Sequence, residues 1–246
     1  MKRTHALRPK GRPAQWPQST APAWAETELA RRAARQLCPP GLTLLRQGVA
    51  AREVYVLQQG AVKLIHNAAT GRECLLGLRA AGDWLGAATA ILQEAAPYSA
   101  VTLTECEVFR LPLADYLDWF HTDAAFAWQQ HAALSHELHG QWHLTAELIC
   151  VPARQRLEQM LWQLAQAQAD GHRQRAVRLQ LPLQQQELAS WLAITPSHLS
   201  RLFKELETAK LLRREKGWLV LPALDKLWRG KHDSTAHDSK GAARRP

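Results

Sequence analysis

The sequence has few cysteines and no pattern that would join them. The four that it contains are Cys38, Cys74, Cys106 and Cys150, and no two of them form a C-x-x-C pair. Small secreted domains carry many closely spaced cysteines, because disulfides support cores that are too small to be stable alone. This chain has 246 residues, of which 46% are hydrophobic, so it is long enough to bury its own core. We therefore expect no disulfide framework, a cytoplasmic location and two domains.

Both ends of the chain lack a long apolar run. Residues 1–24 contain five Lys or Arg side chains, four prolines and no acidic residue. A signal peptide or a membrane anchor needs an uninterrupted apolar segment, so we expect neither, and no membrane partner. We predict that residues 1–24 are a disordered basic arm and that residues 229–246 are a disordered tail.

The side-chain patterns of an enzyme are also missing. Residues 25–122 show no paired carboxylates, no arrangement of nucleophile and base, and no glycine-rich loop that would cradle a phosphate. An enzyme that uses a pocket in this region is therefore the less favoured alternative, and we predict that the protein is not an enzyme.

What the sequence does have is an uneven distribution of charge. The net charge is +9, but residues 25–151 carry nine basic and thirteen acidic side chains. Residues 152–228 carry twelve basic and seven acidic ones. The asymmetry favours an anionic partner for the second region specifically.

Short β-rich runs, separated by glycine and proline, fill residues 38–112 after a helix predicted over residues 24–37. The stretch EVYVLQQGAVKLIH predicts two strands around a tight turn at Gln58–Gly60, where glycine supplies a positive φ. Strands of this length and spacing predict a small sandwich or barrel.

A long helix is predicted next. Asp123 is a good N-cap, and residues 124–150 contain no proline and one glycine. A helix of this length spans roughly 40 Å, which is more than the small sandwich needs, so part of its apolar stripe should pack on a second copy. The stripe consists of Leu134, Leu138, Gln141, Trp142, Thr145, Leu148 and Ile149. Pro152 ends the run, which makes Val151–Pro152 a candidate hinge.

The last region reads as a winged helix-turn-helix. A helix from Pro152 is followed by the strand AVRLQLP, the short helix LQQQELASWL and the turn AIT. A second helix, PSHLSRLFKELETA, then leads into the hairpin LLRREKGWLVLP with Lys216–Gly217 at its tip. Helix, three-residue turn, helix and hairpin is the order of elements in this DNA-binding motif.

The second helix has an apolar back and a polar, basic front. Thr195 is a preferred N-cap, and Pro196 suits the first turn. The apolar arc should pack on the preceding helix through the residues Leu188, Ala189, Leu192, Leu199, Leu202, Phe203 and Leu206. The opposite arc contains Ser197, Arg201, Lys204 and Thr208, and is free to enter a major groove. The alternative is an amphipathic helix with a solvated face, which the charge asymmetry and the hairpin disfavour.

Each side chain on the front has a predicted role in DNA binding. Arg201 has the planar fork that pairs with guanine O6 and N7, while Ser197 and Ser200 are small enough to reach a base edge or a phosphate. The predicted phosphate contacts are Thr195, Lys204, Arg213, Arg214 and Lys216.

Over about residues 25–228 the chain closely resembles the Crp/Fnr family of bacterial transcription regulators. The resemblance is carried by LPLQQQELASWLAITPSHLSRLFKELETAKLL in the second region and by GLTLLRQGVAAREVYVLQQGAVKLI in the first. It implies a homodimer on a two-fold symmetric operator, with half-sites about one helical turn apart. It also implies RNA polymerase as a partner, and it places Ser197, Ser200 and Arg201 on the base-reading positions.

The implied fold class is α+β. It comprises a β-roll (jelly-roll-like) sensor domain over residues 25–122, a dimerisation helix over residues 123–151 and a winged helix-turn-helix domain over residues 152–228. The dimer contacts are predicted at Leu134, Leu138, Trp142, Thr145 and Ile149.

Two departures from the family pattern concern the DNA-binding motif. Many members have Glu where this chain has Ser197, and that Glu accepts a hydrogen bond from cytosine. We therefore expect a half-site different from the commonest family consensus. The second departure is Ala193, which stands where the turn often has glycine.

The effector is not identified by sequence. Family members that bind cyclic nucleotides hold the ribose with Glu and the phosphate with Arg, and here these positions are Ala87 and Tyr98. A methyl group and a phenol cannot replace a carboxylate and a guanidinium, so conventionally bound cyclic AMP is not expected. The corresponding pocket consists of Gly82, Asp83, Gly86, Ala87, Tyr98, Ser99 and Ala100.

Other cofactors are constrained but stay unknown. Iron–sulfur members use an N-terminal cysteine cluster, and residues 1–37 contain no cysteine. Haem stays open, although the stretch after Gly82–Asp83 has no His of the kind found in carbon-monoxide sensors of the family. His136, His139, His143 and Glu147 share one face of the long helix, but a solvated helix face is favoured over a metal site. A thiol sensor is likewise less favoured than buried structural cysteines.

We thus predict a homodimeric regulator of the Crp/Fnr type that binds double-stranded DNA and responds to a signal other than conventionally bound cyclic AMP. Two alternatives stay open, namely a DNA-binding protein whose β-roll is only structural and a haem- or metal-binding sensor.

Overall fold

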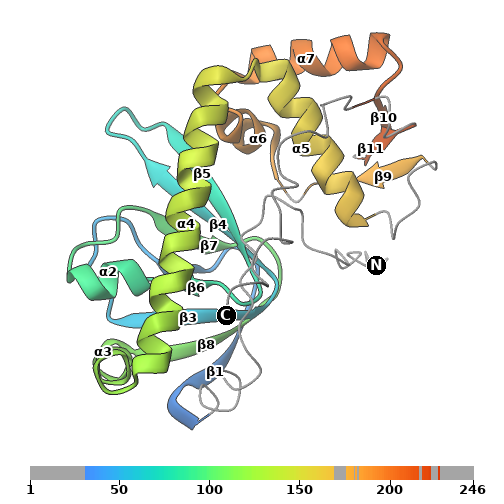
Figure 1. Cartoon of the computed structure of the whole chain (residues 1–246). Helices are drawn as coiled ribbons and strands as arrows, with labels where there is room; N and C mark the ends of the chain where they lie inside the picture. Colours follow the sequence, from blue (N-terminus) through green and yellow to red (C-terminus); the bar gives the residue numbers. More distant parts are fainter. Residues whose placement is uncertain are drawn as a thin grey trace, which may run out of the picture.

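The computed structural model describes residues 31–168, 176–179, 181, 183–215, 218–222 and 227. The predicted basic arm, the predicted tail and the predicted phosphate contact Lys216 lie outside these residues. The described elements form an N-terminal β domain, a long helix and a C-terminal domain of helices and a small sheet, as predicted for the α+β fold class (Figure 1).

The N-terminal domain contains two four-stranded antiparallel sheets. The first has the strand order β1-β8-β3-β6 and the second has the order β2-β7-β4-β5. The strands are β1 (Ala34–Cys38), β2 (Thr43–Leu45), β3 (Glu53–Gln59), β4 (Ala61–Asn67), β5 (Glu73–Ala80), β6 (Trp84–Leu85), β7 (Ser99–Thr102) and β8 (Cys106–Pro112). Apolar side chains from both sheets, such as Leu57, Leu64 and Val108, meet in one core cluster.

The tight turn predicted between the first two long strands is confirmed. Strand β3 ends at Gln59 and β4 begins at Ala61, with Gly60 at φ +100° between them. A Cβ atom on Gly60 would lie 2.5 Å from the backbone oxygen of Glu105, so both conformation and space require glycine.

The helix predicted over residues 24–37 is wrong from residue 34 onward, although residues 31 and 32 are helical. Residues 34–38 form strand β1, which pairs along its whole length with β8. Only Cys38 of this strand is buried. The segment is a strand because it pairs with the edge of β8 through ladder hydrogen bonds, which the local sequence does not reveal.

Three helices complete the sensor half: α2 (Ala87–Leu92), α3 (Leu113–Thr122) and α4 (Ala124–Cys150). The prediction of a 27-residue helix capped by Asp123 is confirmed, since the Asp123 carboxylate accepts hydrogen bonds from the backbone amides of Ala125 and Phe126. The pKa of this carboxyl lies below its usual value, because the Phe126 amide and then the Trp119 indole donate to it. The Phe126 ring stacks on Trp119 at 3.8 Å and fixes the first turn of α4 on α3.

The C-terminal domain contains α5 (Ala153–Gln168), α6 (Gln185–Trp191) and α7 (Pro196–Thr208). Its antiparallel sheet has the order β10-β11-β9, with β9 at Val177–Leu179, β10 at Arg213–Glu215 and β11 at Trp218–Leu221. One apolar core joins all three helices, as shown by fully buried Leu161, Ala189 and Leu199. Among the described residues, no helix is both long and apolar enough to cross a bilayer.

Candidate nucleic-acid interface and sensor pocket

Helix α7 has the well-defined start that its sequence predicts. The Thr195 hydroxyl accepts a hydrogen bond from the backbone amide of His198, and Pro196 occupies the first turn. The apolar back is buried through Leu199, Leu202, Phe203 and Leu206, in the same cluster as Leu188, Ala189 and Leu192 of α6. The predicted docking of α7 on α6 is therefore confirmed.

The front of α7 is exposed at Ser197, Ser200, Arg201 and Lys204. Neither Arg201 nor Lys204 has an ion-pair partner within the described part of the chain, although acidic residues lie on the same helix. Their charges are thus available to an external anion. In Figure 1, α7 lies at the end of the molecule farthest from α3 and β1, so the sensor sheets do not cover it.

The two serines of the front differ in their surroundings. The hydroxyls of Ser197 and Thr195 lie 3.1 Å apart at the start of the helix. The Ser200 hydroxyl donates to the backbone oxygen of Pro196 and accepts a 2.6 Å hydrogen bond from the Gln185 amide of α6. Ser200 therefore joins the two helices of the motif, whereas Ser197 engages only its own helix start.

The two predicted phosphate contacts of β10 also differ. Arg213 is exposed and has no ion-pair partner within the described residues. The Arg214 guanidinium makes two hydrogen bonds, of 2.7 and 2.9 Å, to the Glu207 carboxylate and lies over the Phe203 ring. The hydrogen bonds from Arg214 hold the pKa of Glu207 below its usual value. Arg214 thus fixes β10 on α7.

The turn between α6 and α7 has a strained residue where sequence suggested a departure. Ala193 has φ +51°, in the left-handed region that favours glycine. Its backbone amide donates a 2.9 Å hydrogen bond to Ser190, and the next amide, of Ile194, donates to Ala189. The turn therefore keeps its geometry with alanine.

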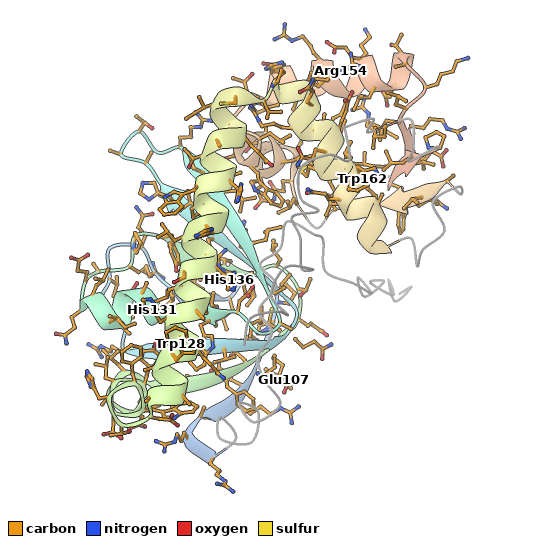
Figure 2. All side chains as sticks on the ribbon, in the orientation of Figure 1. Glu107, Trp128, His131, His136, Arg154 and Trp162 are labelled. Carbon is orange, nitrogen blue, oxygen red and sulfur yellow. The ribbon has the colours of Figure 1, made fainter. Side chains whose placement is uncertain are left out.

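Helix α4 exposes part of its predicted dimer stripe. Leu138, Trp142 and Ile149 are 49%, 61% and 78% exposed, which is unusual for large apolar side chains of one helix. Thr145 is also exposed, while Leu134 and Leu148 are half-buried. Figure 2 shows side chains projecting along the whole length of α4, among them Trp128, His131 and His136.

The histidines of α4 do not gather into a metal site. His136, His139 and His143 are all exposed, and the His139 ring lies 5.3 Å from the Trp142 ring. No three His, Cys, Asp or Glu side chains of the described residues are close enough together to hold a metal ion. Glu147, on the same predicted face, accepts a hydrogen bond from Gln159 of α5 instead.

The residues of the predicted effector pocket are used by the β-roll itself. Gly82 and Gly86 have φ +91° and +86°, and Ala87 and Ala100 are buried. The Asp83 carboxylate accepts from the Ala80 amide at 2.7 Å, and the Ser99 hydroxyl accepts from the Gln47 amide at 3.0 Å. Tyr98 is half-buried, and burial raises the pKa of its phenol. The Asp83 carboxylate and the Ser99 hydroxyl thus already have partners inside the protein.

An ion pair near Tyr98 was not found from the sequence. The guanidinium of Arg79, which is 7% exposed, donates to the Glu137 carboxylate of α4 and to the Leu78 carbonyl. The charges of both residues act on the Tyr98 phenol, which places the pair beside the predicted pocket. No motif marks Arg79, because only the packing of β5 against α4 brings it to Glu137.

A second contact missed by sequence joins the two domains. The Lys63 ammonium on β4 pairs with the Glu187 carboxylate on α6, at 17% and 11% side-chain exposure. The Leu75 amide on β5 donates a 3.0 Å hydrogen bond to the Ser190 hydroxyl, and Trp191 packs against the cluster that contains Ile65. A polar hollow of about 370 Å³ adjoins this domain seam. Helix α6 thus covers the free edge of β5.

The candidate hinge is held by one arginine. Val151 has extended backbone angles at the end of α4, and Pro152 precedes α5. The Arg156 guanidinium donates to the backbone oxygens of Val151, at 2.5 Å, and Leu192, at 2.7 Å. A motion at Val151–Pro152 would therefore reach the end of α6 through Arg156.

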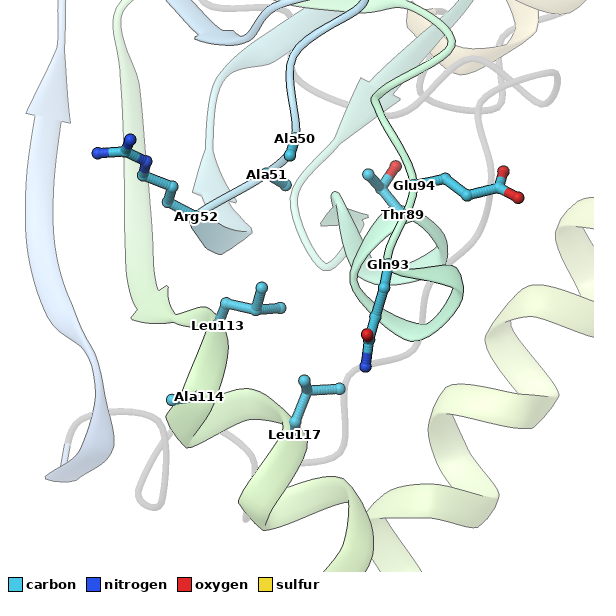
Figure 3. Close-up of a pocket in the computed structure, with 9 residues that line it drawn as sticks. All are labelled: Ala50, Ala51, Arg52, Thr89, Gln93, Glu94, Leu113, Ala114 and Leu117. Atoms are coloured by element: carbon cyan, nitrogen blue, oxygen red, sulfur yellow. The ribbon is translucent and has the colours of Figure 1, made fainter.

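A further hollow of about 540 Å³ lies between the start of β3, α2 and α3. Leu113, Leu117 and Gln93 surround it, whereas the charged ends of Arg52 and Glu94 point away from it (Figure 3). None of the predicted effector residues lines this hollow, so it is separate from the predicted pocket.

Two family models match the chain. Residues 35–123 match the cyclic nucleotide-binding domain, and residues 155–229 match the Crp-like helix-turn-helix domain. Together they cover about two thirds of the sequence. No curated protein sequence matches the chain.

Solved structures of similar proteins share the whole architecture. The c-di-GMP-responsive global regulator CLP of Xanthomonas campestris is 22% identical with a TM-score of 0.69, over 80% of this chain and 97% of that chain. FixK2 of Bradyrhizobium japonicum is 19% identical with a TM-score of 0.63, over 79% and 95% of the two chains. A transcriptional regulator of the CRP/FNR family from Thermus thermophilus is 20% identical with a TM-score of 0.65, over 79% and 96%.

Proposed function

The chain belongs to the Crp/Fnr family of transcription regulators, and from this premise we propose that it binds a two-fold symmetric DNA operator as a homodimer. The observation that carries the proposal is the front of α7, where Arg201 and Lys204 are exposed without an ion-pair partner among the described residues. An arginine on an exposed helix face can pair with guanine in the major groove, and a lysine there can neutralise a phosphate.

Base reading falls to Arg201 and Ser197 in this proposal, with Ser200 as a third and more constrained member. The Ser200 hydroxyl donates to Pro196 and accepts from Gln185, so its remaining lone pair can only accept, for example from an amino group on a base edge. Thr195, Lys204, Arg213, Arg214 and Lys216 are the proposed phosphate contacts. Of these, Arg214 already binds Glu207 through Nε and Nη2. It would contact a phosphate through its remaining Nη1, or with the whole guanidinium after leaving Glu207.

Dimerisation through α4 is supported by its exposed apolar side chains. Leu138, Trp142 and Ile149 form, with Leu134 and Thr145, the stripe that would pack on the same stripe of a second copy. A two-fold interface of this kind presents the same patch from both subunits, and it would set the spacing of the two α7 helices. RNA polymerase is a further proposed partner.

The signal is proposed to differ from conventionally bound cyclic AMP. Ala87 and Tyr98 supply neither carboxylate nor guanidinium, and Arg79 is engaged by Glu137. A signal at the β-roll or at α4 would bias Val151–Pro152 and move α6 through Arg156, which shifts a two-state equilibrium of the DNA-binding domains. The alternative is an effector-independent protein whose β-roll only supports dimerisation.

In-vitro selection of binding sites from random DNA tests the proposal. We expect a palindromic site whose half-site differs from the commonest family consensus, and loss of selection with Arg201→Ala. Recovery of sequences without a palindrome would contradict the dimer. Recovery of the common consensus unchanged would contradict the part of the proposal that concerns Ser197.

Calorimetry with cyclic AMP and with cyclic di-GMP tests which signal the protein binds. Cyclic di-GMP is chosen because the Xanthomonas regulator responds to it. Tight cyclic AMP binding would refute that part. An absorption spectrum after anaerobic purification distinguishes a haem-bound from a cofactor-free protein.

A further inference from the structure

Two buried cysteines of the sensor domain face each other across a strand pair. Cys38 ends β1, Cys106 begins β8, and the two are direct partners in the antiparallel register. Directly opposed residues have Cα atoms about 4.5 or 5.5 Å apart, and both distances lie within the range of about 4.4–6.8 Å that a disulfide tolerates. Opposed side chains also leave the sheet on the same face. The backbone therefore already has the geometry that a cross-strand disulfide needs.

The side chains of the pair share one environment. Cys38 and Cys106 are each 3% exposed and belong to the same core cluster. The Cys106 thiol donates to the backbone oxygen of Ala61 at 3.3 Å, beside the turn at Gly60. Both cysteines are thiols in this structure. Bond formation removes the hydrogen bonds that the Cys106 thiol makes to the backbone oxygens of Ala61 and Thr104.

We propose that Cys38 and Cys106 are a modification site, a dithiol that a hydroperoxide converts to an intramolecular disulfide. One thiolate attacks the peroxide oxygen, which gives a sulfenic acid and releases water or an alcohol after protonation. The second thiol attacks the sulfenic sulfur, forms the S–S bond and releases a second water. Each disulfide formed consumes one peroxide, and two thiol hydrogens leave as the peroxide is reduced.

The environment sets the rate of this reaction. Burial raises the pKa of Cys38 and of Cys106, so little thiolate is present at neutral pH. The thiolate is the reacting form, so the rate rises about tenfold for each unit by which the pH is raised, as long as the pH stays below the pKa of the thiol. Strand β1 lies at the edge of its sheet and pairs only with β8 within the described residues, so its opening gives the oxidant access.

The disulfide would also stabilise the sensor domain. Strand β1 would become covalently fixed to β8, one of the two central strands of its sheet. Closing a long loop in this way removes chain entropy from the unfolded state. We expect the melting temperature of the sensor domain to rise by about 5–10 °C on oxidation and to fall back on reduction.

The experiment uses the full chain with the other two thiols removed by Cys74→Ser and Cys150→Ser, because Cys150 is exposed and would link two chains. The protein is treated with hydrogen peroxide at pH 7 and pH 9, and intact mass, free thiols and disulfide-linked peptides are measured. We expect the loss of two hydrogens from a monomer, a linked peptide pair containing Cys38 and Cys106, faster reaction at pH 9 and reversal by dithiothreitol.

Matched controls carry Cys38→Ala or Cys106→Ala in the same background, and neither can lose two hydrogens. Added oxygen on single cysteines, or two thiols that still react with an alkylating reagent after treatment at pH 9, would overturn the proposal. If the protein with the Cys38–Cys106 disulfide has the same melting temperature as the reduced protein, the predicted stabilisation by the disulfide is wrong. The unsubstituted chain, analysed by peptide mapping alone, keeps the test valid if a variant fails to fold.

Discussion

The DNA-binding domain and the sensor domain differ in what their polar side chains have as partners. On α7 the guanidinium of Arg201 and the ammonium of Lys204 are exposed and without an ion-pair partner in the described part of the chain. In the β-roll the Arg79 guanidinium is held by Glu137 and the Ser99 hydroxyl by Gln47. The first surface is ready for an external anion. In the sensor, a ligand must displace an internal partner or bind at another place. For this reason the DNA-binding surface can be inferred from the structure more easily than the effector.

The largest expected effect is on the stability of the sensor domain, whose core is separate from that of the DNA-binding domain. Phe126→Ala removes a ring that is 1% exposed and stacked on Trp119, so it should destabilise the sensor domain by about 3–5 kcal/mol. Thermal unfolding followed by tryptophan fluorescence should show a large shift of the sensor transition to lower temperature. The transition of the DNA-binding domain should shift less, by the loss of its contacts with β4 and β5 alone. Leu92→Ala, at a side chain 65% exposed, is the control and should change stability by less than about 0.5 kcal/mol. Equal shifts of both transitions would mean that the domains unfold as one unit.

The next prediction concerns DNA affinity alone. Arg201→Ala should weaken binding to the selected operator by about 10- to 100-fold for each half-site, because each bidentate guanine contact contributes about 1–3 kcal/mol of discrimination. Fluorescence anisotropy at several salt concentrations measures it. Lys204→Ala is the matched control, for it should weaken all DNA sequences alike and reduce the salt slope by about one for each subunit, and so by about two for the dimer. If Arg201→Ala weakens random DNA as much as the operator, the arginine contacts phosphate and does not read a base.

These predictions rest on features that differ in how far sequence reveals them. The helix-turn-helix could be predicted because its determinants are local, with a cap at Thr195, a proline at the first turn and an apolar arc of period 3.6. The long helix and the turn at Gly60 were predictable for the same reason. Strand β1 was not, since its partner β8 is distant in sequence and helix propensity favoured the wrong structure.

The contacts that link distant elements were also beyond sequence. Arg79–Glu137, Lys63–Glu187 and the Cys38–Cys106 register depend on how β5, β4 and β1 pack against other elements. No spacing in the chain indicates them. Glu187 takes part in a capping box with Gln184 at the start of α6, but this local motif does not indicate its pairing with Lys63.

A smaller effect tests whether the two domains are coupled. Lys63→Glu places a carboxylate against Glu187 at the domain seam and should destabilise the DNA-binding domain by about 1–2 kcal/mol. The charge-swapped double variant with Glu187→Lys should recover part of this loss in thermal unfolding. Recovery is incomplete because Glu187 also accepts the Gln184 amide at 2.7 Å, a cap that lysine cannot replace. Lys204→Glu, at an exposed site, should leave unfolding unchanged. A double variant no better than the single would mean that the ion pair does not join the domains.

The smallest expected effect lies in the turn of the DNA-binding motif. Ala193 has φ +51°, which costs a residue with a Cβ about 1–2 kcal/mol, whereas glycine adopts it freely. Glycine also gains freedom in the unfolded chain, which offsets about 0.4–1 kcal/mol. Ala193→Gly should therefore stabilise the DNA-binding domain by about 0.5–1 kcal/mol in denaturant unfolding. Ala209→Gly is the control, because Ala209 is also exposed but has φ −74°, and its replacement should not stabilise. Loss of stability with Ala193→Gly would show that the turn depends on the alanine methyl.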